Sequence, residues 1–387
     1  MKERLRLLYL INSLGGGGAE VGMFRILKNL DRRKYASVVV ALSPGVGEEG
    51  IPGRLSEHGI RVVRLGITSR LAATGSILKL LSLLRGERPD VLCGSLFHAS
   101  ILGRVLGRLS GVPVVLTWEH NENLGGPIRV ALNRLTQRLA DVVIADSDRV
   151  GDVVTRRLGV APARLRSVII GGLDLDEIPQ PAPRSARAGV VIGSLGKLRE
   201  QKGYPVLLAA MRLLLDRGLD NVSVEVAGAG PGEAALRAEI LRLGLDAQCR
   251  LVGHRSDIWP FLAGLDVYVQ PSLWEGLCIA VVEAMAMELP VVASGVGGIT
   301  GSVVDGETGL LVAPGNAAAL ADRLDTLIRD PMLRAKLGRA GRERALRLYD
   351  ARTMARAFEG VLDEAVLRVL GLSFDAGAGR WVRARAA

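Results

Sequence analysis

The chain repeats one pattern twice, and this repeat limits its fold more than any other feature. The first half opens with the apolar segment Leu7–Ile11, a run of glycines ending at Gly18 and a stretch of helical spacing. The second half opens in the same way, with Val190–Leu195, a turn at Gly196 and helical spacing over Tyr204–Leu215. Alternating short aliphatic strands and amphipathic helices predict a parallel sheet with helices on both faces. Each half is therefore predicted to be a Rossmann-like α/β domain.

Further aliphatic segments extend each predicted sheet, with helix-like stretches between several of them. Open parallel sheets bind ligands at the carboxyl ends of their strands, so we expect two domains that face each other across a cleft. The additional predicted strands are 37–42, 62–65, 91–93, 112–116 and 142–145 in the first half, and 222–227, 250–252, 267–270 and 291–293 in the second.

A proline-rich stretch separates the two halves. Residues 178–184 contain three prolines, which fit neither a helix interior nor a central strand. A chain of 387 residues is also longer than one hydrophobic core normally serves. We therefore predict an N-terminal domain over residues 1–175, a linker over 176–185, a C-terminal domain over 186–349 and a helical tail over 350–387.

Charge and cysteine content restrict the partners and the compartment. The net charge of +10, from 50 basic and 40 acidic residues, suits a phosphate-bearing ligand, an anionic membrane or nucleic acid. The three cysteines are far apart, which favours neither a disulfide framework nor a metal site and fits a reducing cytosol. The opening segment, interrupted by Arg6, is interpreted as a strand rather than a signal peptide, and no uncharged apolar run is long enough for a membrane span. We expect a cytoplasmic protein.

The clearest chemical motif is Trp274–Ala286, which follows the predicted strand ending at Gln270 and carries Glu275 and Glu283. A helix beginning near Cys278 would present its first amides and the positive end of its dipole, which favour a diphosphate. Glu275 can accept hydrogen bonds from sugar hydroxyls, and Glu283 can hold ribose hydroxyls as the acidic residue of dinucleotide-binding folds does. Alternatively, both glutamates are solvated. The amides predicted to meet the diphosphate are those of Leu277, Cys278 and Ile279.

This region resembles the signature of glycosyltransferase family four. The segments that carry the resemblance are Glu275–Ala286, Leu289–Ser294, Gly297-Gly298 and Val304–Val312. The resemblance extends over nearly the whole chain. It implies the two-domain GT-B fold, transfer with retention of the anomeric configuration and without a metal ion, and a C-terminal tail that returns to the N-terminal domain.

A second motif, Gly196–Gly203, resembles the family's phosphate-binding turn. Lys197 and Lys202 follow a predicted strand beside glycines, where two cations can clamp a diphosphate and offset charge on a leaving nucleotide. The family usually has arginine where Lys197 stands, and lysine lacks the bidentate geometry of arginine. The alternative is that both lysines are solvated in a charged loop.

A third glycine cluster, Gly228–Gly232, argues against a dehydrogenase. Its third glycine comes one position early for a dinucleotide fingerprint, and Glu233 stands where glycine belongs. We interpret it as a tight turn.

His254 and Arg255 follow the predicted strand 250–252 and Gly253. In the family, backbone groups just after this glycine meet the nucleotide base. The resemblance therefore assigns base binding to the main chain of His254 and Arg255, while their side chains are expected at the surface.

The first half carries its own candidates. Gly17 and Gly18 resemble the family's N-terminal glycine loop, where the absence of side chains lets a phosphate or acceptor approach the following helix; a plain strand–helix turn is the alternative. His120 comes just after the predicted strand 112–116, where the family often places a histidine against the transferred sugar. A structural role for His120 stays open. His98 is a weaker candidate on the acceptor side.

Two Asp-x-Asp triplets raise the question of a metal, because single-domain glycosyltransferases bind manganese through such a motif. Asp146–Asp148 follows a predicted strand, and Asp174–Asp176 leads into the linker. Both triplets also fit family segments that bind no metal. We expect no metal and no cofactor besides the donor substrate.

These observations, together with the resemblance to glycosyltransferase family four, predict a hexosyltransferase, and the resemblance implies that it retains the anomeric configuration. It would move a hexose or N-acetylhexosamine from a UDP- or GDP-sugar to a hydroxyl of a lipid-linked glycan, in the synthesis of a cell-surface polysaccharide or glycoconjugate. His120 and Glu275 would act in catalysis, and alanine at Lys202 or Glu275 would abolish useful activity while folding is retained. No nucleic acid partner is expected. An epimerase or phosphorylase on the same fold, or a binding protein without activity, is the alternative.

A peripheral position on the inner face of the cell membrane is a separate hypothesis. Residues 77–85 are strongly apolar with basic edges, as in an interfacial helix that binds anionic lipid. The same pattern is typical of a buried helix that covers a sheet.

Overall fold

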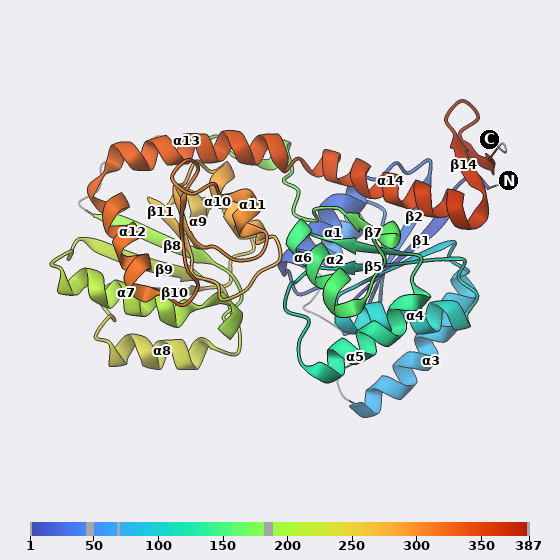
Figure 1. Ribbon diagram of the computed structural model, residues 1–387, viewed down its shortest axis with the longest axis horizontal. Coiled ribbons are helices and arrows are strands. Elements are labelled where there is room, and N and C mark those ends of the chain that lie inside the picture. The colour runs from blue at the N-terminus through green and yellow to red at the C-terminus, as the bar shows by residue number, and fades with distance from the viewer. Residues whose placement is uncertain (1, 44–49, 68–69, 182–188, 385–387) are drawn as a thin grey trace. The chain divides into compact units, whose positions relative to one another are not determined.

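The computed structural model describes residues 2–43, 50–67, 70–181 and 189–384 (Figure 1). By its internal contacts the chain divides into two units. Unit 1 comprises Met1–Gly172 together with Ala351–Ala387, and unit 2 comprises Leu173–Asp350. Residues 182–185 of the predicted linker lie outside the described residues.

Unit 1 is built on a parallel sheet of seven strands in the order β3-β2-β1-β4-β5-β6-β7. The direction of winding reverses between β1 and β4, so polar residues at the carboxyl ends of the central strands gather at one edge. The strands are β1 (Leu5–Ile11), β2 (Tyr35–Ala41), β3 (Arg61–Arg64), β4 (Val91–Ser95), β5 (Val114–Glu119), β6 (Val142–Ala145) and β7 (Leu165–Ser167).

Helices cover the sheet of unit 1, as the alternating pattern predicts. Phe358 of the long helix α14 packs on Trp118 of β5, with ring centroids 4.9 Å apart. The last helix of the chain therefore belongs to the core of unit 1. The helices are α1 (Gly18–Lys28), α2 (Ile51–Glu57), α3 (Arg70–Glu87), α4 (Phe97–Leu109), α5 (Pro127–Thr136), α6 (Asp148–Val153) and α14 (Ala351–Leu370), with short helical turns η1 (Gln137–Leu139), η2 (Val154–Leu158) and η3 (Pro162–Arg164).

The apolar segment 77–85 lies within α3 and packs on the sheet. Leu80 and Leu84 are fully buried in a cluster that includes Leu8 and Leu92. The structure therefore gives this segment the sheet-covering role that the sequence left as an alternative to an interfacial helix. Its apolar face is already occupied by the core.

The segment after α14 differs from the predicted helical tail. It forms an antiparallel hairpin of β14 (Leu372–Asp375) and β15 (Arg380–Arg383). Asp375 accepts hydrogen bonds from the amides of Gly377 and Ala378, which close the turn. Trp381 is fully buried and donates its indole N–H to the carbonyl of Lys34 at 3.0 Å. The turn residues and the buried Trp381 favour a hairpin over a continued helix.

Unit 2 has a six-stranded parallel sheet in the order β10-β9-β8-β11-β12-β13. Its winding reverses between β8 and β11. The strands are β8 (Val190–Leu195), β9 (Val222–Ala227), β10 (Cys249–Gly253), β11 (Val267–Gln270), β12 (Val291–Ser294) and β13 (Leu310–Val312). The helices are α7 (Tyr204–Asp216), α8 (Glu233–Arg242), α9 (Trp259–Ala263), α10 (Ile279–Ala286), α11 (Ile299–Ser302), α12 (Ala317–Arg329) and α13 (Pro331–Leu348), with short turns η4 (Leu175–Glu177) and η5 (Glu200–Lys202).

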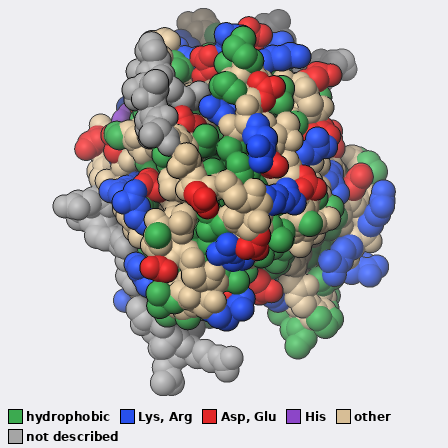
Figure 2. Space-filling model, turned by 90° about the vertical axis from the view of Figure 1, so that its left-hand side faces the viewer, with side chains coloured by type: hydrophobic (Ala, Val, Ile, Leu, Met, Phe, Trp, Pro, Cys, Tyr) green, Lys and Arg blue, Asp and Glu red, His purple; other side chains and the backbone are tan. Residues whose placement is uncertain are grey.

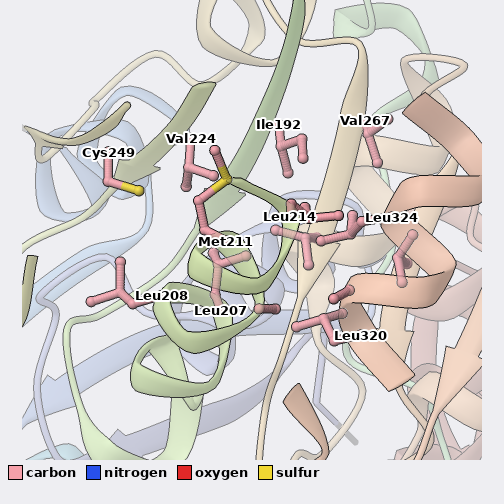
Figure 3. Close-up of a cluster of buried hydrophobic side chains, with 14 of the residues drawn as sticks. Ile192, Leu207, Leu208, Met211, Leu214, Val224, Cys249, Val267, Leu320 and Leu324 are labelled. Atoms are coloured by element: carbon pink, nitrogen blue, oxygen red, sulfur yellow. The ribbon is translucent and has the colours of Figure 1, made fainter. Parts of the chain in front are cut away.

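Aliphatic side chains fill the core of unit 2 (Figure 3). Ile192 and Val224 of the sheet face Met211 of α7, and Leu320 of α12 joins the same cluster. This packing holds β8 rigidly, so the loop that leaves its carboxyl end starts from a fixed point. Both units thus confirm the predicted class of two parallel-sheet, Rossmann-like domains.

The surface charge is mixed. Among the described residues of the face in Figure 2, basic and acidic side chains are interspersed. Within the described ranges, no helix is long and apolar enough to cross a membrane.

Candidate active site

In unit 2, Glu275 lies where the loops after β8 and β11 meet. It is 4% exposed. Its Oε1 accepts hydrogen bonds from Lys202 Nζ at 2.6 Å and from Ser272 Oγ at 2.7 Å, and its Oε2 accepts one from Gln201 Nε2 at 3.3 Å. The structure therefore joins the two sequence motifs, 196–203 and 274–286, through a buried ion pair.

A chain of buried side chains fixes the carboxylate from behind. Gln270 Nε2 donates to Ser272 Oγ at 2.8 Å, and the Tyr268 hydroxyl donates to Gln270 Oε1 at 2.8 Å. The same hydroxyl accepts from the amide of Leu195 at the end of β8. Fully bonded polar networks of this kind rigidify a site. The orientation of Glu275 is thus set by the end of the sheet.

The charges around this pair are well defined. Burial is the largest single influence on the pKa of Lys202 and alone would lower it, but the charge and hydrogen bond of Glu275, together with Cys278 and Tyr204, raise the pKa overall, so Lys202 is an ammonium at neutral pH. Burial raises the pKa of the Cys278 thiol to about 12, with a further contribution from Glu275. Cys278 is therefore a neutral thiol at physiological pH, unlike the thiolates that act as nucleophiles.

Glycines bring the loops of the site into contact. Gly203 has φ +63°, and a Cβ there would lie 2.0 Å from the carbonyl oxygen of Pro271. A Cβ on Gly297 would lie 2.1 Å from the carbonyl oxygen of Glu275. A backbone oxygen can move away only if its whole loop shifts. The absence of a side chain at these two glycines therefore allows the close approach of the loops that carry Lys202 and Glu275.

Helix α10 begins directly after this pair. Cys278 precedes the helix with φ +62°. The side chains of Leu277, Cys278 and Ile279 are buried, so these residues can contact a ligand only through their main-chain groups. Glu283, inside the helix, is 5% exposed. The site thus combines one buried ammonium with a helix start, two features that favour a phosphate group.

The remaining candidates of unit 2 lie at its surface or near it. Lys197 is half-buried in the turn after β8, and His254 and Arg255 are exposed after β10. Arg255 lines a pocket of about 590 Å³ along β10 and α8. Neither Lys202 nor Glu275 belongs to the lining of that pocket.

In unit 1, His120 is buried, with 7% exposure, and both of its ring nitrogens have partners. Nδ1 lies 2.7 Å from Asp146 Oδ2, and Nε2 lies 2.6 Å from Ser95 Oγ. Trp118 donates its indole N–H to Asp146 Oδ1 at 2.6 Å and stacks on the imidazole. The carboxylate can only accept, so the network assigns the proton of a neutral His120 to Nδ1 and makes Nε2 the acceptor from Ser95.

The sequence indicated His120 but not these partners. Ser95 and Asp146 come at the ends of β4 and β6, the two strands that flank β5, and the registers pair Ser95 with Trp118 and Glu119 with Ala145. Polar residues that end three neighbouring parallel strands converge. The position of Ser95 and Asp146 at the ends of the strands on either side of β5 was therefore the feature of the sequence that could have identified them as partners of His120.

The Asp146 carboxylate can be tested by replacement. Asp146→Asn is expected to lower the free energy of unfolding by about 1–3 kcal/mol, because two buried N–H donors lose a charged acceptor. Nitrogen-15 NMR of the imidazole should also show less of the Nδ1–H tautomer. Asp148→Asn is the matched control, because Asp148 belongs to the same triplet but is exposed. Equal urea midpoints and spectra for the two variants would contradict the assignment.

The other candidates of unit 1 lie at helix starts. Gly17 precedes α1, which begins at Gly18, and Ser13 Oγ donates to the buried Glu20 at 2.8 Å. His98 is exposed near the start of α4, with its ring edge-on to Phe97. Partial burial, and then the charge of a nearby arginine, lower the pKa of His98, so its imidazole is neutral at pH 7.

The first Asp-x-Asp triplet begins with Asp146, and both oxygens of this carboxylate accept hydrogen bonds from ring N–H groups, those of Trp118 and His120. Within the described residues, no group of three or more His, Cys, Asp or Glu side chains is arranged to hold a metal ion.

Two family models match the chain. Residues 17–171 match a glycosyl transferase 4-like domain, and residues 181–344 match glycosyl transferases group 1. The matched ranges include every candidate catalytic, donor-binding and acceptor-side residue of both units.

Individual relatives agree with these models. The chain is 31% identical to the alpha-maltose-1-phosphate synthase of Mycolicibacterium smegmatis, over 67% of this chain and 75% of that protein. It is 29% identical to the capsular polysaccharide biosynthesis glycosyltransferase CapM of Staphylococcus aureus, and that match spans about half of each protein. Among solved structures, Anabaena Alr3699/HepE in complex with UDP and glucose has a TM-score of 0.80 at 23% identity, covering 92% of this chain and 99% of that one. This last likeness concerns the fold.

Proposed function

The chain belongs to the group 1 glycosyltransferases, with the GT-B fold, and from this premise we propose the donor, the acceptor and the roles of its residues. The donor is a UDP- or GDP-sugar, and the acceptor is a hydroxyl of a lipid-linked glycan in cell-surface polysaccharide or glycoconjugate synthesis. The structure of HepE contains UDP and glucose, and CapM is named for capsular polysaccharide biosynthesis, which supports both classes.

One observation carries the proposal: the buried Lys202–Glu275 ion pair at the start of α10. In unit 2 the Lys202 ammonium and the amides before Val281 would hold the diphosphate, with Lys197 beside them. Glu275 would orient the sugar through its hydroxyls, and Glu283 would hold the ribose. The main chain of His254 and Arg255 would meet the base.

In unit 1 the proposal gives Gly17 and Gly18 contact with a phosphate or acceptor, and His98 a place on the acceptor side. His120 would steady the sugar as positive charge develops at its anomeric carbon. Asp146 and Ser95 would then be positioning residues, because they hold the imidazole at 2.7 and 2.6 Å.

The reaction needs no protein nucleophile. The bond from the anomeric carbon to the phosphate oxygen breaks while the acceptor oxygen bonds to the same face of that carbon. The departing phosphate oxygen takes the acceptor's proton. Negative charge grows on the diphosphate during this step, and a fixed ammonium and helix dipole stabilise it. No step is assigned to a metal ion.

The test is a thermal-shift screen with UDP, GDP and their hexose and N-acetylhexosamine esters, followed by transfer to a soluble acceptor glycan. A ligand at about 100 times its Kd adds about 2.7 kcal/mol to the stability of the folded protein. We expect one nucleotide class to raise Tm, turnover that resists EDTA, and a product with the donor's anomeric configuration by proton NMR.

Other outcomes would support the alternatives. A nucleotide sugar that binds and is never consumed would indicate a protein without activity. Sugar release without an acceptor, or phosphate acting as the acceptor, would indicate an epimerase or phosphorylase. An inverted product would overturn the proposed stereochemistry.

A further inference from the structure

Helix α5 and the turn η1 carry a stripe of large apolar side chains that faces solvent. Ile128 is 74% exposed, Leu132 45%, Leu135 72% and Leu139 36%. Their spacing of four, three and four residues places them on one side of a helix. Figure 1 shows α5 beside α4 at the outside of unit 1. We call these four residues the α5 stripe.

The opposite face of α5 is mainly polar where it meets the protein, although Val130 packs there against a hydrophobic cluster. Asn133 is buried, accepts a hydrogen bond from Arg104 at 2.5 Å and donates to Glu119 at 3.3 Å. Gln137 is buried as well. An ordinary surface helix buries its apolar face and exposes its polar one. Helix α5 shows the reverse arrangement, with the four aliphatic side chains of the stripe exposed. Packing in the core of unit 1 therefore does not explain why these four positions are aliphatic.

Arginines flank the stripe. Each residue of an α-helix is rotated by about 100° from the one before it, which places Arg129 on one side of the stripe and Arg134 and Arg138 on the other. The chain has no acidic residue between Asn123 and Ala140. Among the residues that the structure describes, no carboxylate pairs with any of these three arginines, although Arg129 stacks over the Phe97 ring at 4.1 Å.

We propose that the α5 stripe docks onto the surface of an anionic lipid bilayer. The four aliphatic side chains would enter the boundary between headgroups and acyl chains, and the three arginines would meet lipid phosphates. Apolar residues flanked by cations on a helix that lies in the interface are the usual composition of such an anchor. The surface is separate from the proposed transfer reaction and does not depend on it.

Charge complementarity favours lipid over a second copy of the chain. Two-fold contacts bring the same patch of both subunits together, so a dimer through α5 would place arginines opposite arginines. An anionic bilayer instead offers a negative surface on both sides of the stripe.

The experiment is flotation of the full chain with vesicles of phosphatidylglycerol and phosphatidylcholine, against vesicles of phosphatidylcholine alone, at low and high salt. We expect binding to the anionic vesicles that weakens with salt. Leu132→Ser combined with Leu135→Ser should weaken binding at least about tenfold, since each buried leucine side chain contributes strongly. Arg134→Gln combined with Arg138→Gln should weaken it by about 25-fold, at about fivefold per arginine.

A matched control uses exposed apolar residues elsewhere. Leu241 and Met332 lie in unit 2, with 69% and 76% exposure, so Leu241→Ser combined with Met332→Ser removes similar apolar surface from another place. This control should bind like the wild type, and circular dichroism melts should show that every variant is folded.

Three results would overturn the proposal. They are no flotation of the wild type with anionic vesicles, equal loss in the control variant, and a dimer by sedimentation velocity that Leu135→Ser disrupts. The thermal shift with nucleotide sugars should be the same in all variants, which separates this test from that of the transfer reaction.

Discussion

Lys202→Met is expected to lower kcat by about 10²–10³-fold, the usual effect of losing one preorganised charge from a transition state. Lys202 is held by Glu275 at 2.6 Å beside the start of α10, so its charge costs no reorganisation when a diphosphate departs. Methionine keeps the length of the side chain and removes the charge. The measurement is kcat with saturating nucleotide sugar and acceptor.

The same variant should lose stability, which the sequence could not indicate. The Lys202 and Glu275 side chains are 16% and 6% exposed, and removing one member of a buried ion pair costs about 3–5 kcal/mol. Alanine at either position would therefore weaken folding as well as activity. Lys202→Met combined with Glu275→Gln should be more stable than the sum of the single variants implies, because neither charge is then left unpaired.

This double variant separates folding from chemistry. It should remain folded by urea titration while its kcat stays at least as low as that of Lys202→Met. If either variant turns over at the wild-type rate, the role assigned to Lys202 is wrong.

Gly203→Ala is expected to destabilise the protein by about 3–5 kcal/mol, in the range of the most severe single substitutions. Two causes add. A left-handed residue with a Cβ costs about 1–2 kcal/mol, and this Cβ would also lie 2.0 Å from the Pro271 carbonyl oxygen. Relief of the contact would push the turn that carries Lys202 away from the loop that carries Glu275, so activity should fall too.

Gly218→Ala is the matched control. Gly218 has φ +79°, but its Cβ would meet no atom within 4 Å. It should therefore show the conformational cost alone, about 1–2 kcal/mol. Urea titration of both variants measures the difference. Equal losses at the two positions would mean that the loops can move apart freely and that Gly203 does not fix the site.

Strands of the sheets could be predicted from the sequence because each depends on a local run of aliphatic residues. The segments 190–195 and 267–270 are β8 and β11 with the same bounds. Glu275 and His120 were identified because they come shortly after such strands, in segments that resemble those of the family. The ion pair between Lys202 and Glu275 could not be, since it joins residues 73 positions apart through the packing of two loops.

Other features depend on which face of an element meets the protein. The apolar pattern of 77–85 and that of α5 both suit a membrane surface, but only the structure shows that Leu80 is buried and Leu135 is exposed. The hairpin at the end of the chain was missed because its stability comes from Trp381, which is buried against Tyr35 of β2 with ring centroids 5.6 Å apart.

The division of unit 1 into two stretches of sequence has a consequence for the order of folding during synthesis. Domains generally fold as they leave the ribosome, the N-terminal one first. Here Phe358 and Trp381, which complete the packing around β5 and β2, are translated after all of unit 2. The second unit can therefore finish folding first, while the first waits with Trp118 uncovered for the last helix and hairpin to emerge.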